Sequence, residues 1–174
     1  MAMSARLRKF VLTVHIAASV GWVGAVLAYL PLDVTTRYQD DAAILRAAYV
    51  GMDLIAQWAL IPLAVAAFVT GLIISLGTPW GLFRHYWVII SLLLTGFATW
   101  ILIIEARTIA FLADAATDPT MTTEQLQALP STLPHSVGGL VVLLIVLALN
   151  IYKPRGLTRY GWRKQQQKAG APGK

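Results

Sequence analysis

Four long apolar runs with few charges, separated by polar connections, make up most of the chain. Each run is close to the length of about 20 residues that an α-helix needs to cross the hydrocarbon core of a bilayer. Nearly all charged side chains fall between the runs or at their ends, which is the hydropathy pattern of a multi-pass membrane protein. We therefore predict an all-α fold, a transmembrane four-helix bundle with spans at residues 10–32, 53–77, 86–105 and 134–152.

Proline and polar residues indicate where the first two spans end or bend. Pro31 and Asp33 are expected to end the first span, and residues 34–42 to form a polar connection. An amphipathic stretch from residue 43 leads into the second span. In that span Pro62 has no N–H for the carbonyl of Trp58, so we expect a kink.

The second half of the chain contains one further helix signal. The third span should continue as a helix toward Leu112, and residues 113–133 should form a connection. Within that connection Thr122 and Gln125 have the spacing of a capping box, which predicts a short helix. The turn after the second span is predicted at Thr78, Pro79 and Gly81.

The distribution of lysine and arginine predicts the orientation. With the N-terminus inside, the cytoplasmic segments hold eleven of the fourteen basic residues, and the other side holds Arg37, Arg46, Arg107 and all eight acids. We therefore predict a bacterial inner-membrane protein with both termini in the cytoplasm. It comprises a four-span domain (residues 1–154) and a basic tail (residues 155–174) that is poorly ordered at its end. The basic residues flank apolar runs, which argues against nucleic-acid binding.

The composition excludes several kinds of functional site. The chain is 57% apolar and has no cysteine, which excludes disulfides, thiolate metal sites and cysteine nucleophiles. It also lacks a glycine-rich phosphate loop and the His-Glu-x-x-His and Gly-x-Ser-x-Gly motifs. We interpret it as a non-catalytic or accessory protein whose partners are the lipid bilayer and a second copy or another membrane protein. Small residues that would allow close helix approach are Ala17, Gly21, Gly24, Ala25 and Ala28.

His15 is the ionisable residue that lies deepest within a predicted span, and such residues are candidates for function. It shares a helix face with Ser19 and Trp22. We interpret it first as a histidine that donates a hydrogen bond to a backbone carbonyl of a neighbouring helix. The alternatives are ligation of a haem or metal ion, and proton transfer.

Other polar residues fall at the span ends. His85 and His135 are expected at opposite membrane boundaries, where both are interpreted as solvated. A second group is interpreted either as solvated helix ends or as a polar cluster on the outer side, with Arg46 nearby. It consists of Asp53, Gln57, Glu105 and Arg107.

Two stretches resemble known families. Residues 150–164 (NIYKPRGLTRYGWRK) are similar to the closing motif of a bacterial family of four-helix integral membrane proteins of undefined function. Residues 15–31 (HIAASVGWVGAVLAYLP) resemble the first helix of HemJ-type protoporphyrinogen oxidases and, more loosely, of CopD-type membrane proteins. HemJ-type proteins bind haem b and require a histidine of the first helix, which corresponds to His15, so the resemblance makes His15 a candidate axial ligand. The lysine that they carry early in the third helix corresponds to Ser91 here. In this interpretation His85 is a candidate second ligand and Trp22 lines the pocket.

Overall fold

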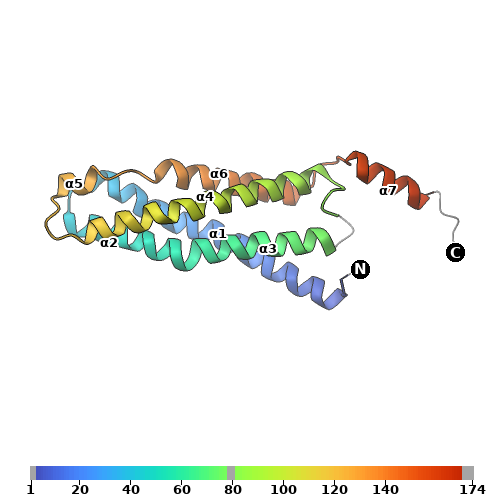
Figure 1. The fold of residues 1–174 in the computed structure, drawn as a ribbon, viewed down its shortest axis with the longest axis horizontal. Coiled ribbons are helices and arrows are strands. Elements are labelled where there is room, and N and C mark those ends of the chain that lie inside the picture. The colour runs from blue at the N-terminus through green and yellow to red at the C-terminus, as the bar shows by residue number, and fades with distance from the viewer. Residues whose placement is uncertain (1–2, 78–80, 170–174) are drawn as a thin grey trace.

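The fold is a bundle of long, antiparallel helices (Figure 1). The structure is a computed structural model. It describes residues 3–77 and 81–169, apart from the side chains of residues 168 and 169. No β-strand is found in these two ranges. In chain order the elements are α1 (Ala5–Tyr38), α2 (Ala42–Ile55), the π-helical turn η1 (Ala56–Leu60), α3 (Ile61–Gly77), α4 (Tyr86–Thr117), α5 (Thr123–Gln127), α6 (Leu133–Tyr152) and α7 (Arg159–Ala169).

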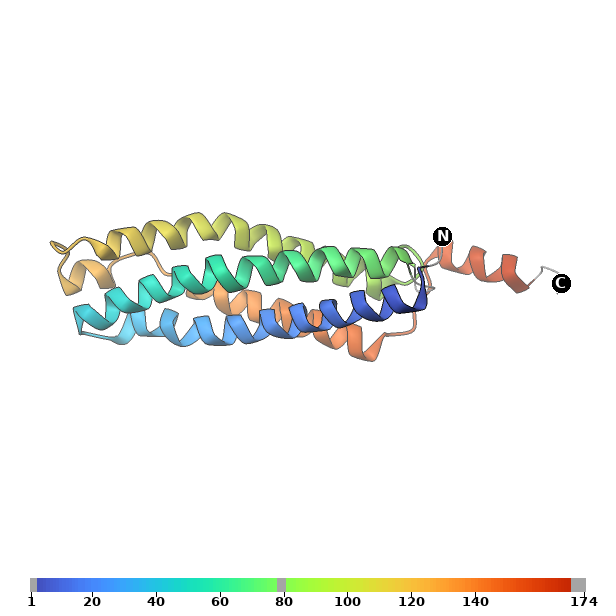
Figure 2. The same cartoon turned by 90° about the horizontal axis from the view of Figure 1, so that it is seen from below.

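Within the described ranges, four helical segments are long and apolar enough to cross a membrane, as predicted: α1, the continuous stretch α2–η1–α3, α4 and α6. The protein is therefore an all-α, multi-pass membrane protein with a four-helix transmembrane bundle. Helix α5 lies at one end of the bundle, and the start of α1 and α7 lie at the other (Figures 1 and 2). We call these the α5 end and the tail end.

The prediction that Pro31 and Asp33 end the first helix is wrong. Helix α1 continues through both residues to Tyr38, and the connection to α2 is only residues 39–41. The extra turns place Asp33 and Thr36 inside the bundle, at 0% and 2% exposure. Polar side chains that looked like a solvated connection therefore face protein, and the helix is continued by packing against α2 and α6.

The second span is irregular at the predicted place. The π-helical turn η1 ends at Leu60, two residues before Pro62, and the Ile61 N–H donates to the carbonyl of Ala56, five residues earlier. A π turn is one way in which a helix accommodates an interruption in its regular hydrogen bonding.

Helix α4 extends further than expected, to Thr117, so the predicted connection at residues 113–133 begins later. The capping box of α5 is confirmed, because Thr122 and Gln125 exchange both hydrogen bonds. Helix α6 begins one residue before its predicted start at Pro134 and ends at Tyr152 as predicted. Of the predicted turn, Gly81 is described and has a φ of 63°; Thr78 and Pro79 lie outside the described residues.

The tail is not simply an extension of the bundle. Residues 159–169 form α7, a polar helix that was not expected from the pattern of apolar residues and that points away from the bundle (Figure 2). The end of the tail, residues 170–174, to which the prediction of poor order applies, lies outside the described residues.

Two groups of buried side chains hold the bundle together. The larger follows the membrane-spanning part and includes Ala18, Trp22, Ala64 and Ala67. The smaller closes the α5 end and consists of Leu45, Tyr49, Leu112, Ala116 and Leu126.

The small residues of α1 divide between two faces. Gly21 allows close approach to Leu63 of α3, where an added Cβ would lie 3.2 Å from the Leu63 side chain. Gly24 and Ala28 are exposed instead, and a Cβ at Gly24 would meet nothing within 4 Å. Close helix packing within the bundle therefore uses Gly21, whereas Gly24 and Ala28 lie on the outer surface.

Candidate functional site

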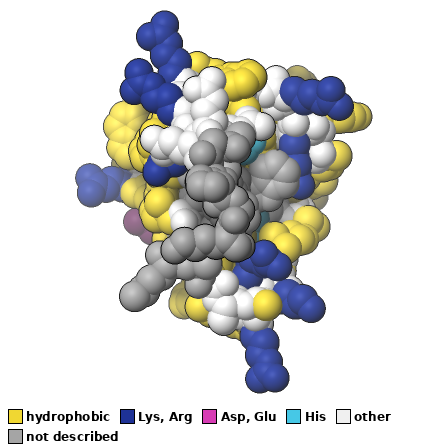
Figure 3. Space-filling view, turned by 90° about the vertical axis from the view of Figure 1, so that its right-hand side faces the viewer, with side chains coloured by type: hydrophobic (Ala, Val, Ile, Leu, Met, Phe, Trp, Pro, Cys, Tyr) yellow, Lys and Arg dark blue, Asp and Glu magenta, His cyan; other side chains and the backbone are white. Residues whose placement is uncertain are grey.

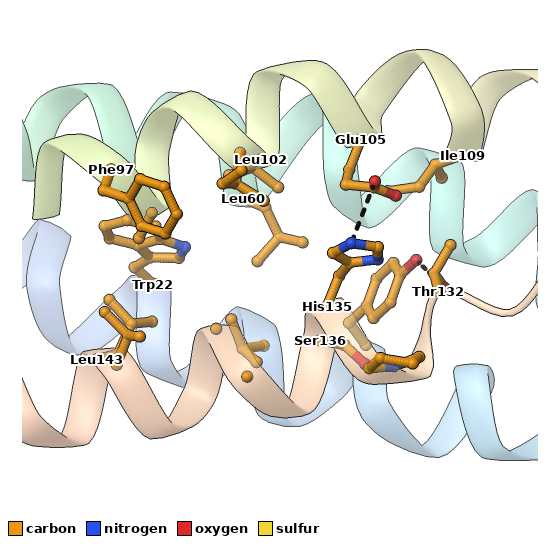
Figure 4. A pocket seen from close by; sticks show the side chains of 18 residues that line it. Trp22, Leu60, Phe97, Leu102, Glu105, Ile109, Thr132, His135, Ser136 and Leu143 are labelled. Carbon is orange, nitrogen blue, oxygen red and sulfur yellow. Dashed lines mark hydrogen bonds and ion pairs between the residues drawn. The ribbon is translucent and has the colours of Figure 1, made fainter. Parts of the chain in front are cut away.

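A cavity of about 320 Å³ opens between α4 and α6 and reaches α1 and η1 (Figure 4). We call it the α4–α6 cavity. Its walls are mainly apolar, which is typical of a site that receives the apolar body of a ligand. The lining residues are Trp22, Val26, Tyr29, Leu60, Phe97, Ala98, Ile101, Leu102, Glu105, Ile109, Thr132, Pro134, His135, Ser136, Gly138, Gly139, Val142 and Leu143.

One end of the cavity is polar. Glu105 from α4 and His135 from α6 face each other across it, with 3.6 Å between Oε1 of the carboxyl and Nε2 of the imidazole (Figure 4). The side chain of His135 is 52% exposed and that of Glu105 is 19% exposed, so both groups are accessible from the cavity mouth. Beside them the hydroxyls of Tyr29 and Thr132 share a hydrogen bond of 3.0 Å.

The other end of the cavity is apolar. Trp22, which is 4% exposed, and Leu143 form its wall, and Phe97 of α4 stands opposite (Figure 4). The space exists partly because α6 carries two adjacent glycines on this stretch. A Cβ added to Gly138 or Gly139 would meet no atom within 4 Å.

Asp33 lies behind the polar end and was missed as a functional candidate. Its carboxyl is fully buried, and Ser136 Oγ, which also lines the cavity, donates to Oδ2 at 2.7 Å. Within the described part of the chain Oδ1 has no hydrogen-bond partner. Burying a carboxyl without hydrogen-bond partners costs folding free energy, so we expect Asp33 to have a functional role. The signal was present in the sequence, since Asp33 continues the buried helical row of Trp22, Val26 and Tyr29.

His15 makes the helix contact that we favoured. Its Nδ1 lies 3.1 Å from the carbonyl oxygen of Ala67 and 3.1 Å from Oγ1 of Thr70, both on α3. Gly71 leaves room for the ring, because a Cβ there would lie 3.1 Å from Cε1 of His15. With the proton on Nδ1, His15 donates a second hydrogen bond to the carbonyl of Ala67 and so links α1 to α3.

The four residues suggested for a haem site are distributed over different places. Trp22 lines the α4–α6 cavity, and His85 lines a separate pocket at the tail end. His15 and Ser91 line neither of these two spaces. Ser91 is buried in α4, and its hydroxyl has no hydrogen-bond partner among the described residues.

The predicted outer polar residues also separate. Gln57 donates to Asp53 at 3.4 Å on the surface of the second span. Glu105 instead faces His135 in the cavity, and Arg107 is exposed. His135, interpreted as a solvated interface residue, is half exposed and forms part of the cavity.

Fold and site together define an integral membrane protein whose four-helix bundle encloses a cavity with one polar end. Compared with known proteins, the chain matches no protein-family model, no curated protein and no solved structure. The site must therefore be interpreted from its own geometry.

Proposed function

We propose that the chain is a non-catalytic, accessory protein of the bacterial inner membrane that holds a small amphiphilic molecule in the α4–α6 cavity. The observation that carries this proposal is the polarity of the cavity, which is apolar from Trp22 to Leu102 and polar at Glu105 and His135. Its volume of about 320 Å³ is within the usual range for small-molecule sites.

The polar end of the cavity indicates which hydrogen bonds the head group of the ligand must form. A carboxyl, an imidazole and the hydroxyls of Tyr29 and Thr132 together offer donors and acceptors in a small space. A head group that both donates and accepts hydrogen bonds, such as one with two hydroxyls, matches this set. The apolar body would then lie against Trp22 and Leu143. The flanking lipid supplies such molecules directly, since α6 faces outward over most of its length.

The test uses monoolein, an uncharged amphiphile with two hydroxyls, and native mass spectrometry of the detergent-purified protein. The variant Gly139→Leu should fill the cavity and weaken monoolein binding by about tenfold, which is about 1.4 kcal/mol. Gly24→Leu is the matched control, because Gly24 is also a helical glycine with open space around its Cβ but lies outside the cavity. Equal binding by the unmutated protein and Gly139→Leu would refute the proposal.

The orientation with both termini in the cytoplasm is part of the same proposal. It is supported by the count of basic residues, most of which lie in the predicted cytoplasmic segments. Arg37 and Arg46, which lie outside those segments, donate hydrogen bonds to backbone carbonyls at the α5 end. A reporter enzyme that works only in the cytoplasm should be active when it is fused after Lys174, and one that works only in the periplasm should be inactive there. Activity of a periplasmic reporter at that position would reverse the orientation.

Haem b binding is a second candidate, favoured by one observation. Metal-bound histidines commonly donate their other ring N–H to a backbone carbonyl, and Nδ1 of His15 faces the carbonyl of Ala67 in this way. His15 would hold the haem iron through Nε2, with Nδ1 kept on the carbonyl of Ala67. His85 lines the tail-end pocket and Ser91 offers only a hydroxyl, so neither supports a second ligand. Bound haem would supply one-electron transfer.

A visible spectrum of the protein purified from haem-sufficient cells tests this second candidate. A Soret band is expected in the unmutated protein and should be lost in His15→Ala, while Ser91→Ala should retain it. A protein without a Soret band, or a band unchanged in His15→Ala, would rule out His15 as the ligand.

A further inference from the structure

The tail end has a second hollow of a different character, which we call the tail-end pocket. Its volume is about 770 Å³, and it lies between the start of α4, the α6–α7 connection and the first half of α7. Four of its lining residues are cationic, and none of those described is acidic: Arg84, Lys153, Arg155 and Lys164 line it together with His85 and Trp162. Figure 3 looks onto the tail end and shows lysine and arginine side chains spread around the outline of this end of the molecule.

Backbone hydrogen bonds hold the walls of this pocket in place. The N–H of Thr158 donates to the carbonyl of Arg84 at 3.0 Å, and the N–H of Tyr86 donates to the carbonyl of Gly156 at 3.3 Å. His85 and Leu157 pair as an isolated antiparallel bridge between these bonds. The connection between α6 and α7 is therefore fixed onto the start of α4, and the pocket is preformed.

The next residues fix the direction of α7. Thr158 Oγ1 accepts from the N–H of Gly161 at 3.1 Å and itself donates to the carbonyl of Phe83. Gly161 is buried directly against the carbonyl of Arg84, where a side chain would collide. Lys153 adopts a left-handed conformation with a φ of 43°, which turns the chain out of α6 and into the pocket wall.

The pocket lies where two apolar helices meet polar segments of the chain. Lys153 directly follows the apolar helix α6, and Tyr86 is the first residue of the apolar helix α4. Tyr86, Tyr152 and Trp162 are all more than half exposed at this level. Tyrosine and tryptophan favour the headgroup region, so the basic pocket is at the depth of lipid phosphates.

We propose that the tail-end pocket binds the phosphate headgroup of an anionic phospholipid. Guanidinium and ammonium groups donate charge-assisted hydrogen bonds to phosphate oxygens, and basic pockets between membrane helices recognise anionic lipids in this way. The boundary position and the exposed aromatic rings select a lipid over free phosphate, because the acyl chains can extend along α4 and α6. The site is separate from the α4–α6 cavity and shares no lining residue with it.

The experiment measures lipid binding to the full chain in detergent by native mass spectrometry. Phosphatidylglycerol and phosphatidylcholine are titrated against the unmutated protein and the double variant Arg155→Gln, Lys164→Gln. The unmutated protein should prefer phosphatidylglycerol, and the double variant should lose about 30-fold in affinity for it, from two basic residues near the surface. The matched control is Arg6→Gln, Arg8→Gln, which removes the same charge from the exposed start of α1 and should stay within about twofold.

Two results would overturn the proposal. The first is an equal loss in both double variants, which would mean that only the net charge of the tail end matters. The second is loss of the phosphatidylglycerol preference in millimolar inorganic phosphate, which would identify free phosphate as the ligand. Thermal unfolding of each variant shows whether it is folded, and Gly24→Leu, which lies outside both hollows, should bind phosphatidylglycerol normally.

Discussion

At the α5 end of the bundle arginine side chains are used inside the protein, whereas at the tail end basic side chains line an open pocket. Arg37 donates to the carbonyls of Gln127 and Leu129, at 3.1 and 3.2 Å. Arg46 donates to the carbonyls of Ala116, Asp118 and Met121. These carbonyls lie at or after the ends of α4 and α5, where a helix leaves its last acceptors unsatisfied.

The difference changes how the charge asymmetry of the sequence is understood. Three basic residues lie outside the predicted cytoplasmic segments. Arg37 and Arg46 link helices by donating hydrogen bonds to backbone carbonyls, and Arg107 is exposed. The basic residues available to a membrane surface are therefore even more concentrated at the tail end than the sequence suggests. This strengthens the proposed cytoplasmic position of that end.

The two ends also differ in packing. Helix α1, with 34 residues, is about 51 Å long at 1.5 Å per residue, more than the roughly 30 Å of a bilayer core. The part of the bundle at the α5 end that exceeds this thickness has its own small core, in which Leu45 and Leu126 are completely buried. The tail end is held by a backbone bridge around a hollow. We expect the α5 end to be much more sensitive to substitution.

The largest effect is expected for Leu45→Ala. Leu45 has 0% exposure, so its truncation leaves a cavity in the small core and should lower the free energy of unfolding by about 3 kcal/mol. The preceding residue gives the control, since Ile44 is 45% exposed and Ile44→Ala should cost less than about 1 kcal/mol. Unfolding in mixed micelles with rising denaturing detergent measures both. Similar losses for the two variants would show that the α5 end is not closed as described.

Arg46→Met should have the next largest effect. It leaves the carbonyls at the end of α4 without their donor and should lower the free energy of unfolding by about 2 kcal/mol. Arg107→Met removes the same charge from an exposed position of the same end and should change the stability by about 0.5 kcal/mol or less. If the two variants are equally stable, Arg46 contributes only charge.

These comparisons show which features the sequence makes predictable. The four spans follow from hydropathy alone, because a helix in lipid must satisfy its own backbone and needs a fixed length. The α5 capping box is likewise a local signal. The sequence predicts that the first span ends at Pro31 and Asp33, because a proline and an acid together usually indicate a helix end. The burial of Asp33 depends on Ser136, which is 103 residues away in the chain.

The α4–α6 cavity and α7 were missed for different reasons. The cavity depends on how far α6 stands from α4, and no local pattern fixes that distance. The glycines at 138 and 139 were a signal, but glycine is common in membrane helices. Helix α7 has no apolar period of the kind that predicts a core-facing helix. Its first turn is placed by contacts of Thr158 with residues 83 and 84.

Gly161→Ala tests the tail end and should have a smaller, local effect. A Cβ at residue 161 would collide with the carbonyl of Arg84, so the bridge must shift and the N–H of Thr158 should exchange faster, by about fivefold, or about 1 kcal/mol. Gly156→Ala is the matched control, because its Cβ would make an ordinary contact of 3.7 Å with Tyr86. Hydrogen exchange with mass spectrometry measures both. Faster exchange across all helices in Gly161→Ala would contradict a local role.

The smallest effect concerns Asp118, in the turn that follows α4. The hydroxyl of Thr120 donates to this carboxylate at 2.7 Å and the Thr120 N–H at 2.8 Å, and these bonds lower the pKa of Asp118. Because the pKa is lower in the folded protein than in the unfolded chain, the stabilisation is complete above about pH 5 and is lost as the pH falls through the folded pKa.

Thr120→Ala should therefore raise the pKa of Asp118 toward the ordinary value of an aspartate, measured as the carboxyl carbon shift in an NMR titration. At neutral pH the variant should be slightly less stable than the unmutated protein, and the difference should vanish at acid pH, where Asp118 is protonated in both. Thr117→Ala is the control, since its hydroxyl donates to the carbonyl of Asp114 and not to this carboxylate. A difference in stability that grows at acid pH would have the wrong sign. In that case the turn would not be held by the charged form of Asp118.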